Sequence, residues 1–273
     1  MLKLLFACAT IALFSGCASN TYQYGTGKHG STNKAPVIHQ QVYQGAPSPI
    51  LDASDWYWPP SLIAKLFLWN KNIDSHEVSQ ETIDELLLYL DKNDLDDVQV
   101  LVNTYKPGLQ FSRLFKNREV GAGWRYTLGL LSTSLYAVLP GRFFGGDHYN
   151  PYTNTISIYS DDPAIAIHEG GHAKDFNSRR WKGLNAALYM LPGAALYYEA
   201  VATSDALSYL QWECRYNEEK DAYKTLHPAY GTYIGGLAHT VTGGVLIGAI
   251  PGHITGAIGA ANVEENPACE LKD

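Results

Sequence analysis

The sequence predicts an α+β protein in which a small sheet packs on a central helix, a second helix follows downstream and a glycine-rich helical segment comes last. Three observations lead to this expectation. Apolar residues recur with a helical period in residues 79–93, and apolar and polar residues alternate in residues 97–105. Residues 161–176 begin with an acidic pair and a proline, as helices often do. Together these patterns mix helices and strands within one chain.

The elements before the central helix can be placed in order. Ser79 is a suitable N-cap for the helix over residues 79–93, and Pro107 ends the strand over residues 97–105. A short helix is expected near residues 112–117, and the uncharged stretch 126–139 is expected to form a buried helix. Two strands should follow, at residues 142–149 and 154–160.

The central helix is expected to begin at the acidic pair. Asp161 or Asp162 can cap it, and Pro163 fits its first turn. Gly170 and Gly171 would each cost a helix interior about 1 kcal/mol relative to alanine. A glycine pair at this place indicates a close backbone neighbour or a ligand that offsets the loss.

His168 and His172 lie four residues apart on this helix, so both imidazoles can reach one metal ion. Glu169 lies one residue round from the first histidine, beside the open coordination position rather than in the ligand set. A general base for metal-bound water belongs there.

At these three residues the sequence resembles the zincin metallopeptidases, whose hallmark is an HExxH helix. The resemblance implies a zinc ion held by His168 and His172, with Glu169 as catalytic base. It also implies a zincin-like sheet whose edge strand precedes this helix and aligns an extended peptide. The residues expected there are Thr155, Ile156, Ser157, Ile158 and Tyr159.

Catalytic zinc usually takes three protein ligands, so a third must lie downstream. The zincins that use a histidine six residues after the motif are disfavoured, because that position is Ser178. Glu199, in a segment of small and apolar residues, has the spacing of the gluzincins. Many of these carry an aspartate four residues later, whereas this chain has Thr203 there and an aspartate at Asp205. Glu199 is therefore the expected third ligand, and Asp205 is either its rival or the residue that orients a motif histidine.

Peptide hydrolysis also needs a donor for the oxyanion of the tetrahedral intermediate. His227, Tyr230 and Tyr233 follow the ligand helix and are candidates by order and chemistry. His148 and Tyr149, ahead of the expected edge strand, are alternatives. Core packing is the competing interpretation for each tyrosine, because the chain contains 19 of them.

The N-terminus resembles a bacterial lipoprotein signal peptide, with a lysine at position 3, an apolar run and then Cys17. The resemblance implies removal of residues 1–16 and a lipid on Cys17. Ala18 lacks the aspartate that would retain a lipoprotein in the inner membrane. We therefore expect a lipid anchor in the cell envelope, in the outer membrane facing the periplasm.

Two cysteines remain beyond the lipidated one, Cys214 and Cys269. An exported protein can keep them as a disulfide, and two unlinked thiols are the alternative. Removal of the signal takes one lysine and no acid, so the net charge of −7 becomes −8. An acidic chain without a basic cluster is a poor binder of nucleic acid, so the expected partners are a peptide or protein substrate and the membrane.

The composition suggests five regions. Residues 1–16 are the signal peptide, residues 17–54 a flexible tether and residues 55–232 the zincin-like domain. Residues 233–261 lack Asp, Glu, Lys and Arg, and residues 262–273 form an acidic tail. The uncharged region has glycines on a four-residue grid, which favours a glycine zipper in a membrane or an assembly, or a helical hairpin around Pro251.

The sequence thus predicts a zinc-dependent metallopeptidase of the bacterial cell envelope, in which Glu169 assists the attack of zinc-bound water on a peptide bond. The alternative is a non-enzymatic, metal-stabilised envelope lipoprotein whose glycine-zipper segment mediates assembly or enters the membrane. A zincin-like fold acting on a non-peptide substrate is a third hypothesis.

Overall fold

The computed structural model describes residues 22–26, 41–46, 48, 49, 52, 59–139, 141–144, 146–238, 243–264 and 269. The expected signal peptide and Cys17 lie outside them. The chain divides into two compact units. We call Tyr24–Ala206 the sheet unit, and Met1–Gln23 with Leu207–Asp273 the helical unit.

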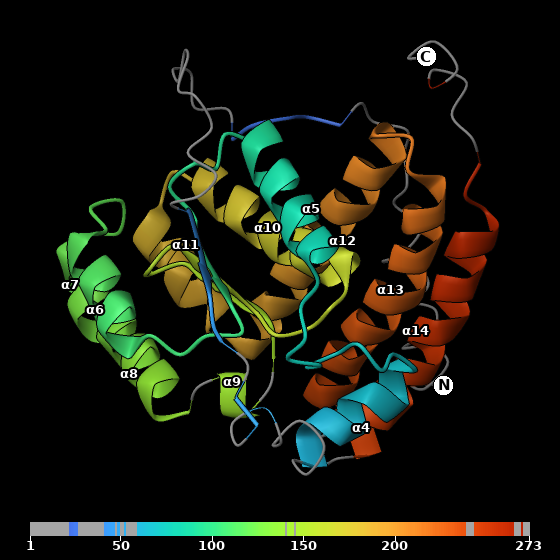
Figure 1. Ribbon diagram of the computed structural model, residues 1–273, viewed down its shortest axis with the longest axis horizontal. Coiled ribbons are helices and arrows are strands. Elements are labelled where there is room, and N and C mark those ends of the chain that lie inside the picture. Colours follow the sequence, from blue (N-terminus) through green and yellow to red (C-terminus); the bar gives the residue numbers. More distant parts are fainter. Residues whose placement is uncertain are drawn as a thin grey trace. The chain divides into compact units, whose positions relative to one another are not determined.

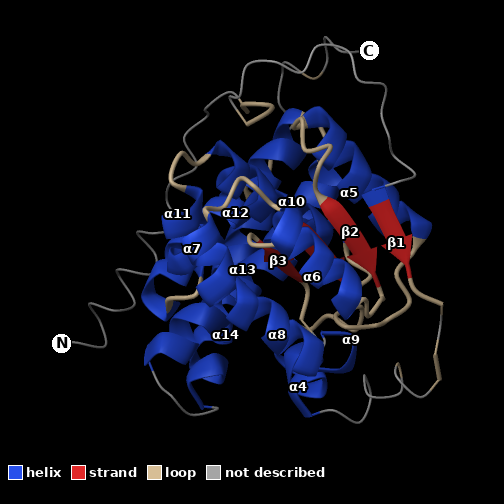
Figure 2. Cartoon of the chain, turned by 90° about the vertical axis from the view of Figure 1, so that its left-hand side faces the viewer, coloured by secondary structure: helices blue, strands red, loops and turns tan. Residues whose placement is uncertain are grey.

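The sheet unit contains a mixed sheet with the strand order β1-β2-β4-β3. The first three strands in this order run parallel, and β3 is antiparallel to β4 with Tyr149 opposite Ile156. Figure 2 shows β1 and β2 side by side. The strands are β1 (Val42–Gln44), β2 (Gln99–Val102), β3 (His148–Asn150) and β4 (Thr155–Ile158).

Two expectations about these strands are wrong. Residues 155–158 do not form an edge, because β4 pairs with β2 on one side and β3 on the other; the edges are β1 and β3. The tether expected over residues 17–54 also contains ordered parts. Val42–Gln44 completes the sheet as β1, and Tyr22 is buried against the ring of Tyr209 in the helical unit.

The helices of the sheet unit are labelled in Figure 1, and α10 packs on β3 and β4. The strand expected over residues 142–149 is shorter than predicted, since α9 occupies its first half. The helices are α4 (Pro59–Leu68), α5 (Gln80–Lys92), α6 (Pro107–Lys116), α7 (Ala122–Trp124), the π-helical η1 (Arg125–Gly129), α8 (Leu130–Val138), α9 (Gly141–Phe144), α10 (Pro163–Ser178), α11 (Lys182–Tyr189) and the start of α12 (Pro192–Trp212).

The predicted caps of α5 and α10 are confirmed. Ser79 Oγ accepts a hydrogen bond from the backbone of Thr82, and Asp162 Oδ1 accepts one from Ala164 at 2.9 Å. The carboxylate of Asp161 binds α5 instead, since it accepts hydrogen bonds from Ser79 and Thr82 at the start of that helix. The two helices that pack together, α5 and α10, therefore also share polar contacts at their N-termini.

The segment 126–139 forms helix as expected, but its burial was overestimated. Leu131, Leu135 and Val138 on α8 are exposed. Charge-free composition alone could not distinguish a buried helix from one that presents apolar side chains at the surface.

The helical unit pairs α13 (Tyr216–Ala238) with α14 (Gly243–Ala261), side by side in Figure 1. A Cβ on Gly248 would lie 1.9 Å from the carbonyl oxygen of Gly231, and one on Gly252 would lie 2.5 Å from Cα of Pro228. The glycine grid thus lets these two helix backbones approach within the chain. Among the described residues, no helix is both long and apolar enough to cross a membrane.

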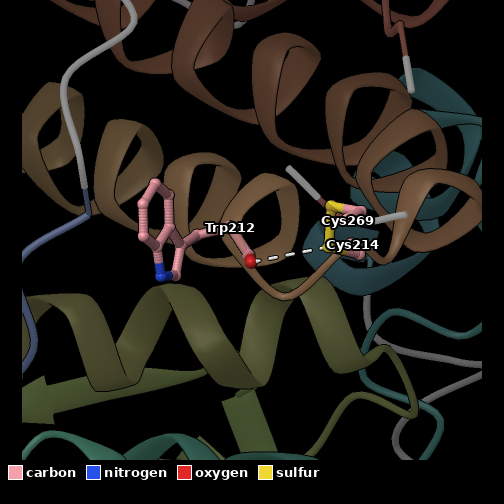
Figure 3. Close-up of a disulfide and its surroundings, with 3 residues drawn as sticks. All are labelled: Trp212, Cys214 and Cys269. Atoms are coloured by element: carbon pink, nitrogen blue, oxygen red, sulfur yellow. Dashed lines mark hydrogen bonds between the residues drawn. A yellow bond between two sulfur atoms is a disulfide. The ribbon is translucent and has the colours of Figure 1, made fainter. Parts of the chain in front are cut away.

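The structure joins Cys214 and Cys269 in a disulfide, with their Cα atoms 5.8 Å apart (Figure 3). The bond closes a loop of 55 residues that includes α13 and α14. In the chain-entropy account such a loop contributes about 4 kcal/mol to folding.

We expect the double variant Cys214→Ser, Cys269→Ser to lose about that much free energy of unfolding, because its unfolded chain regains the loop entropy. Urea titration followed by circular dichroism measures the loss. The same titration of wild-type protein in a reducing agent should reproduce the variant. Equal midpoints in oxidised, reduced and variant protein would show that the bond does not stabilise the helical unit.

Candidate metal centre

His168, Glu169 and His172 lie in the middle of α10, which the sheet and α5 bury. Both histidines and the glutamate are less than a tenth exposed. The imidazole rings are 4.7 Å apart, as one helical turn requires. The metal-binding geometry expected from the spacing of the histidines is therefore present.

Glu199 reaches the same place from α12. Its carboxylate oxygens lie 3.1 Å from His168 Nε2 and 3.4 Å from His172 Nε2. One donor atom from each of the three residues lies within 4.8 Å of the others, so the cluster could hold a metal ion. Donors at zinc distances in a tetrahedron are about 3.3–3.5 Å apart, so these contacts fit a shared ion.

Close packing of α10 on α12 sets this geometry. A Cβ on Gly171 would lie 3.0 Å from the carbonyl oxygen of Ala202 and 3.2 Å from its Cα. The expected close backbone neighbour is confirmed for Gly171, whereas a Cβ on Gly170 would meet the ring of Tyr89 at 2.5 Å. Ala202 is less than one turn beyond Glu199, so this contact positions the ligand carboxylate.

We expect Gly171→Ala to weaken metal binding by on the order of tenfold or more, since displaced metal-site groups commonly cost 10- to 100-fold. The added methyl group must push α12 away from α10. Each helix can remain folded, so the change acts on the distance between them. Zinc titration against a chromogenic chelator measures the affinity. The matched control is Gly193→Ala on α12, where a Cβ meets nothing within 4 Å; the prediction is wrong if both variants bind alike.

The rival ligand Asp205 is placed elsewhere by the structure. Its carboxylate accepts hydrogen bonds from Tyr89 Oη and from Lys174 Nζ, the latter at 2.8 Å. Thr203 lies instead beside the first histidine, with Oγ1 at 3.4 Å from His168 Nδ1. Thr203, at the position where the resemblance would lead one to expect an aspartate, therefore lies next to His168, and the cluster that could bind a metal contains Glu199.

Glu169 is buried next to this cluster. Among the described residues its Oε2 has no hydrogen-bond partner, and neither does His172 Nδ1. Burial raises the pKa of Glu169 to about 8; the charge of Glu199 adds to this rise, and His172 and the backbone of Tyr149 oppose it. Buried polar atoms without partners are uncommon and often mark a site that a ligand completes.

The electrostatics of the cluster favour positive charge. Burial alone would lower the pKa of His172, but the carboxylate of Glu199 raises it to about 9. Burial alone would raise the pKa of Glu199, but the two imidazoles hold it well below its usual range. Burial lowers the pKa of His168 despite its hydrogen bond to Glu199. A metal cation that replaces the proton on His172 would be coordinated by one carboxylate and two imidazoles.

Tyr189 on α11 is a neighbour of the site that the sequence did not predict. Its ring lies 5.7 Å from that of His172, and its hydroxyl donates a hydrogen bond to the carbonyl oxygen of His172 at 3.3 Å. No spacing rule links this residue to the motif, because the contact depends on how α11 folds back on α10.

The oxyanion candidates are distributed over both units. His148 and Tyr149 lie in β3, and the backbone of Tyr149 is close to the carboxylate of Glu169. His227, Tyr230 and Tyr233 lie on α13 in the helical unit, where His227 Nδ1 is 3.3 Å from Thr255 Oγ1. Their role as oxyanion donors stays a prediction.

The cluster thus combines three potential ligands with a buried carboxylate whose oxygen lacks a partner. Comparison with known proteins adds no relative, since no family model, no curated protein and no solved structure matches this chain.

Proposed function

We propose that this chain is a zinc-dependent metallopeptidase of the bacterial cell envelope with a zincin-like site. One observation carries the proposal. The donor atoms of His168, His172 and Glu199 converge within 4.8 Å, and Glu169 is buried beside them with an oxygen that lacks a partner. Two histidines and a glutamate are a donor set typical of catalytic zinc in peptidases.

Each residue has a distinct task in this proposal. Zinc bound at the cluster would act as a Lewis acid on a peptide carbonyl and lower the pKa of a water molecule. Glu169 would accept the proton of the attacking water and deliver it to the leaving amine. Thr203 would hold the ring of His168 in orientation through Nδ1.

A peptide that adds to the sheet beside Glu169 would pair with β3 and not with β4. The sheet ends at β3 on that side, and the backbone of Tyr149 lies next to the Glu169 carboxylate. Main-chain pairing at a sheet edge aligns an extended peptide without regard to its sequence. Residues 148–150 therefore replace residues 155–159 as the proposed substrate strand.

The envelope location rests on the N-terminal sequence, with a lipid on Cys17 as the anchor. The disulfide between Cys214 and Cys269 agrees with a compartment that permits such bonds.

The test uses the mature protein, without its lipid, purified gently and analysed for metal by mass spectrometry. We expect one zinc per chain, hydrolysis of a mixed peptide library, loss of both on dialysis against a chelator, and recovery of both with zinc. Zinc without hydrolysis would refute the peptidase function, and protein that binds no zinc would refute the metal centre.

A non-enzymatic metal-stabilised lipoprotein is the second candidate. It is favoured by the outer face of α14, where Ile250, Ile254 and Ile258 are all more than half exposed. The glycines of this helix pack on α13, so the isoleucine face rather than the glycine grid would contact a partner. A fourth protein ligand on zinc, seen by X-ray absorption, would favour this structural role; water there would favour the enzyme.

A further inference from the structure

A cavity of about 360 Å³ lies in the sheet unit between α8, β3 with its following turn, and α11. Tyr149 and Tyr152, both buried, line it together with the fully buried Ala186. Leu135 and Met190, both exposed, line it as well and lie where it meets solvent. Its size is at the lower end of the ~300–1,000 Å³ typical of small-ligand sites, which suits one side chain rather than a folded segment.

The cavity wall offers little to a charged ligand. The hydroxyl of Tyr149 donates a hydrogen bond to Asn154 at 2.7 Å, and that of Tyr189 donates one to the carbonyl of His172. The hydroxyl of Tyr152 lies 3.8 Å from the sulfur of Met190. The lining includes no Asp, Glu, Lys or Arg. Ser132, His148 and Asn150 add polar atoms to the lining, and Asn150 donates a hydrogen bond to Ser132 at 3.2 Å. The other lining groups are ring faces and aliphatic groups, so a charged guest would be poorly compensated.

Two lining residues also contact the metal centre. The ring of Tyr189 packs at 5.7 Å on that of His172, and the backbone of Tyr149 lies next to the Glu169 carboxylate. A side chain in the cavity would therefore belong to a residue close to the reacting carbonyl.

We propose that this cavity binds a bulky apolar side chain of the substrate, aromatic or long aliphatic, next to the bond that is cleaved. The inference rests on the proposed peptidase function and adds its substrate preference. Leu135 and Met190 border the entrance, and Ala186 leaves the space that a larger residue would fill.

The first experiment measures binding without hydrolysis. N-acetyl-L-phenylalanine methylamide is titrated into the protein and followed by ligand-observed NMR, with the glutamate analogue for comparison. We expect the phenylalanine probe to bind, the glutamate probe not to bind, and Leu135→Trp to weaken binding by about tenfold or more, a loss within the range that altered apolar pockets cause.

The matched control is Leu131→Trp, one turn earlier on α8, where the leucine is also exposed but does not line the cavity. It should bind the probe as wild type does. Ala186→Leu blocks the cavity from its inner wall and should reproduce Leu135→Trp. Unchanged binding in both cavity variants, or equal loss in Leu131→Trp, would overturn the assignment.

The second experiment measures kcat/KM on peptides that differ only in the residues flanking the cleaved bond. We expect wild type to prefer a large apolar residue on one side, and Leu135→Trp to shift the preference toward alanine or glycine by about tenfold. Hydrolysis without such a preference would overturn the cavity assignment alone. Probe binding with no hydrolysis of any peptide would overturn the peptidase function.

Discussion

Replacing Glu169 with glutamine will leave zinc binding intact and lower peptide hydrolysis by about 10²- to 10⁴-fold, the usual contribution of a general base. Glutamine has nearly the same shape but cannot accept the proton of the attacking water. Glu169 is adjacent to the ligand cluster without belonging to it, so the metal should stay. Zinc content and kcat/KM on the same preparation test both parts.

We do not expect the loss of hydrolysis in Glu169→Gln to come from a loss of folding stability. In the metal-free protein the pKa of Glu169 is raised from 4.5 to about 8, so its neutral form contributes stability that is complete below pH 4.5 and is lost as pH rises through 8. Glutamine is always neutral and avoids this loss. The variant should therefore unfold at a temperature equal to or above that of wild type at pH 8.

Glu219 provides a matched control for this variant. It is buried on α13, burial raises its pKa to about 7, and its Oε2 also has no hydrogen-bond partner among the described residues. Glu219→Gln should hydrolyse peptides at the wild-type rate. Retained hydrolysis in Glu169→Gln, or equal loss in both variants, would contradict the role given to Glu169.

Replacing Glu199 with alanine should have the largest effect on metal affinity. The carboxylate is the only negative charge in the proposed ligand set, and it contacts both histidines at 3.1 and 3.4 Å. The affinity should fall by more than the roughly 10- to 100-fold that loss of an orienting partner costs. Competition with a zinc chelator of known affinity gives the measurement, and hydrolysis should fall in parallel at limiting zinc.

Asp205→Asn is the control, because Asp205 was the rival ligand in the sequence. The structure pairs this carboxylate with Tyr89 and Lys174, so the asparagine variant should keep its zinc. If Asp205→Asn lost zinc and Glu199→Ala retained it, the ligand set would have to be redrawn.

The candidate site divides into a local part and a part that depends on packing. Helical geometry alone places two histidines four residues apart on one face of a helix. The N-cap is Asp162, one of the two aspartates expected to cap the helix. Spacing along the sequence favoured Glu199 over Asp205, but helical geometry alone could not settle the choice. It depends on how α12 is rotated against α10, which the contact between Gly171 and Ala202 decides.

The sheet shows the same division. Alternating valines were enough to locate the strand that becomes β2, since strand patterning is local. Strand order was not predictable, because β4 pairs on one side with β3, which directly precedes it, and on the other with β2, which lies much earlier in the chain. The mistaken edge strand and the missed contribution of residues 42–44 both come from this non-local pairing.

By itself, then, the sequence determined the motif helix, its cap and its histidine pair, all of which depend on residues within a few turns; the catalytic role of Glu169 stays a prediction. The tertiary structure brings Glu199, which the sequence had favoured, beside the histidines, and it alone decided that Thr203 and Tyr189 contact them and that a cavity adjoins them. The physical reason is that burial, helix rotation and strand order arise from contacts between distant segments, which no local pattern encodes.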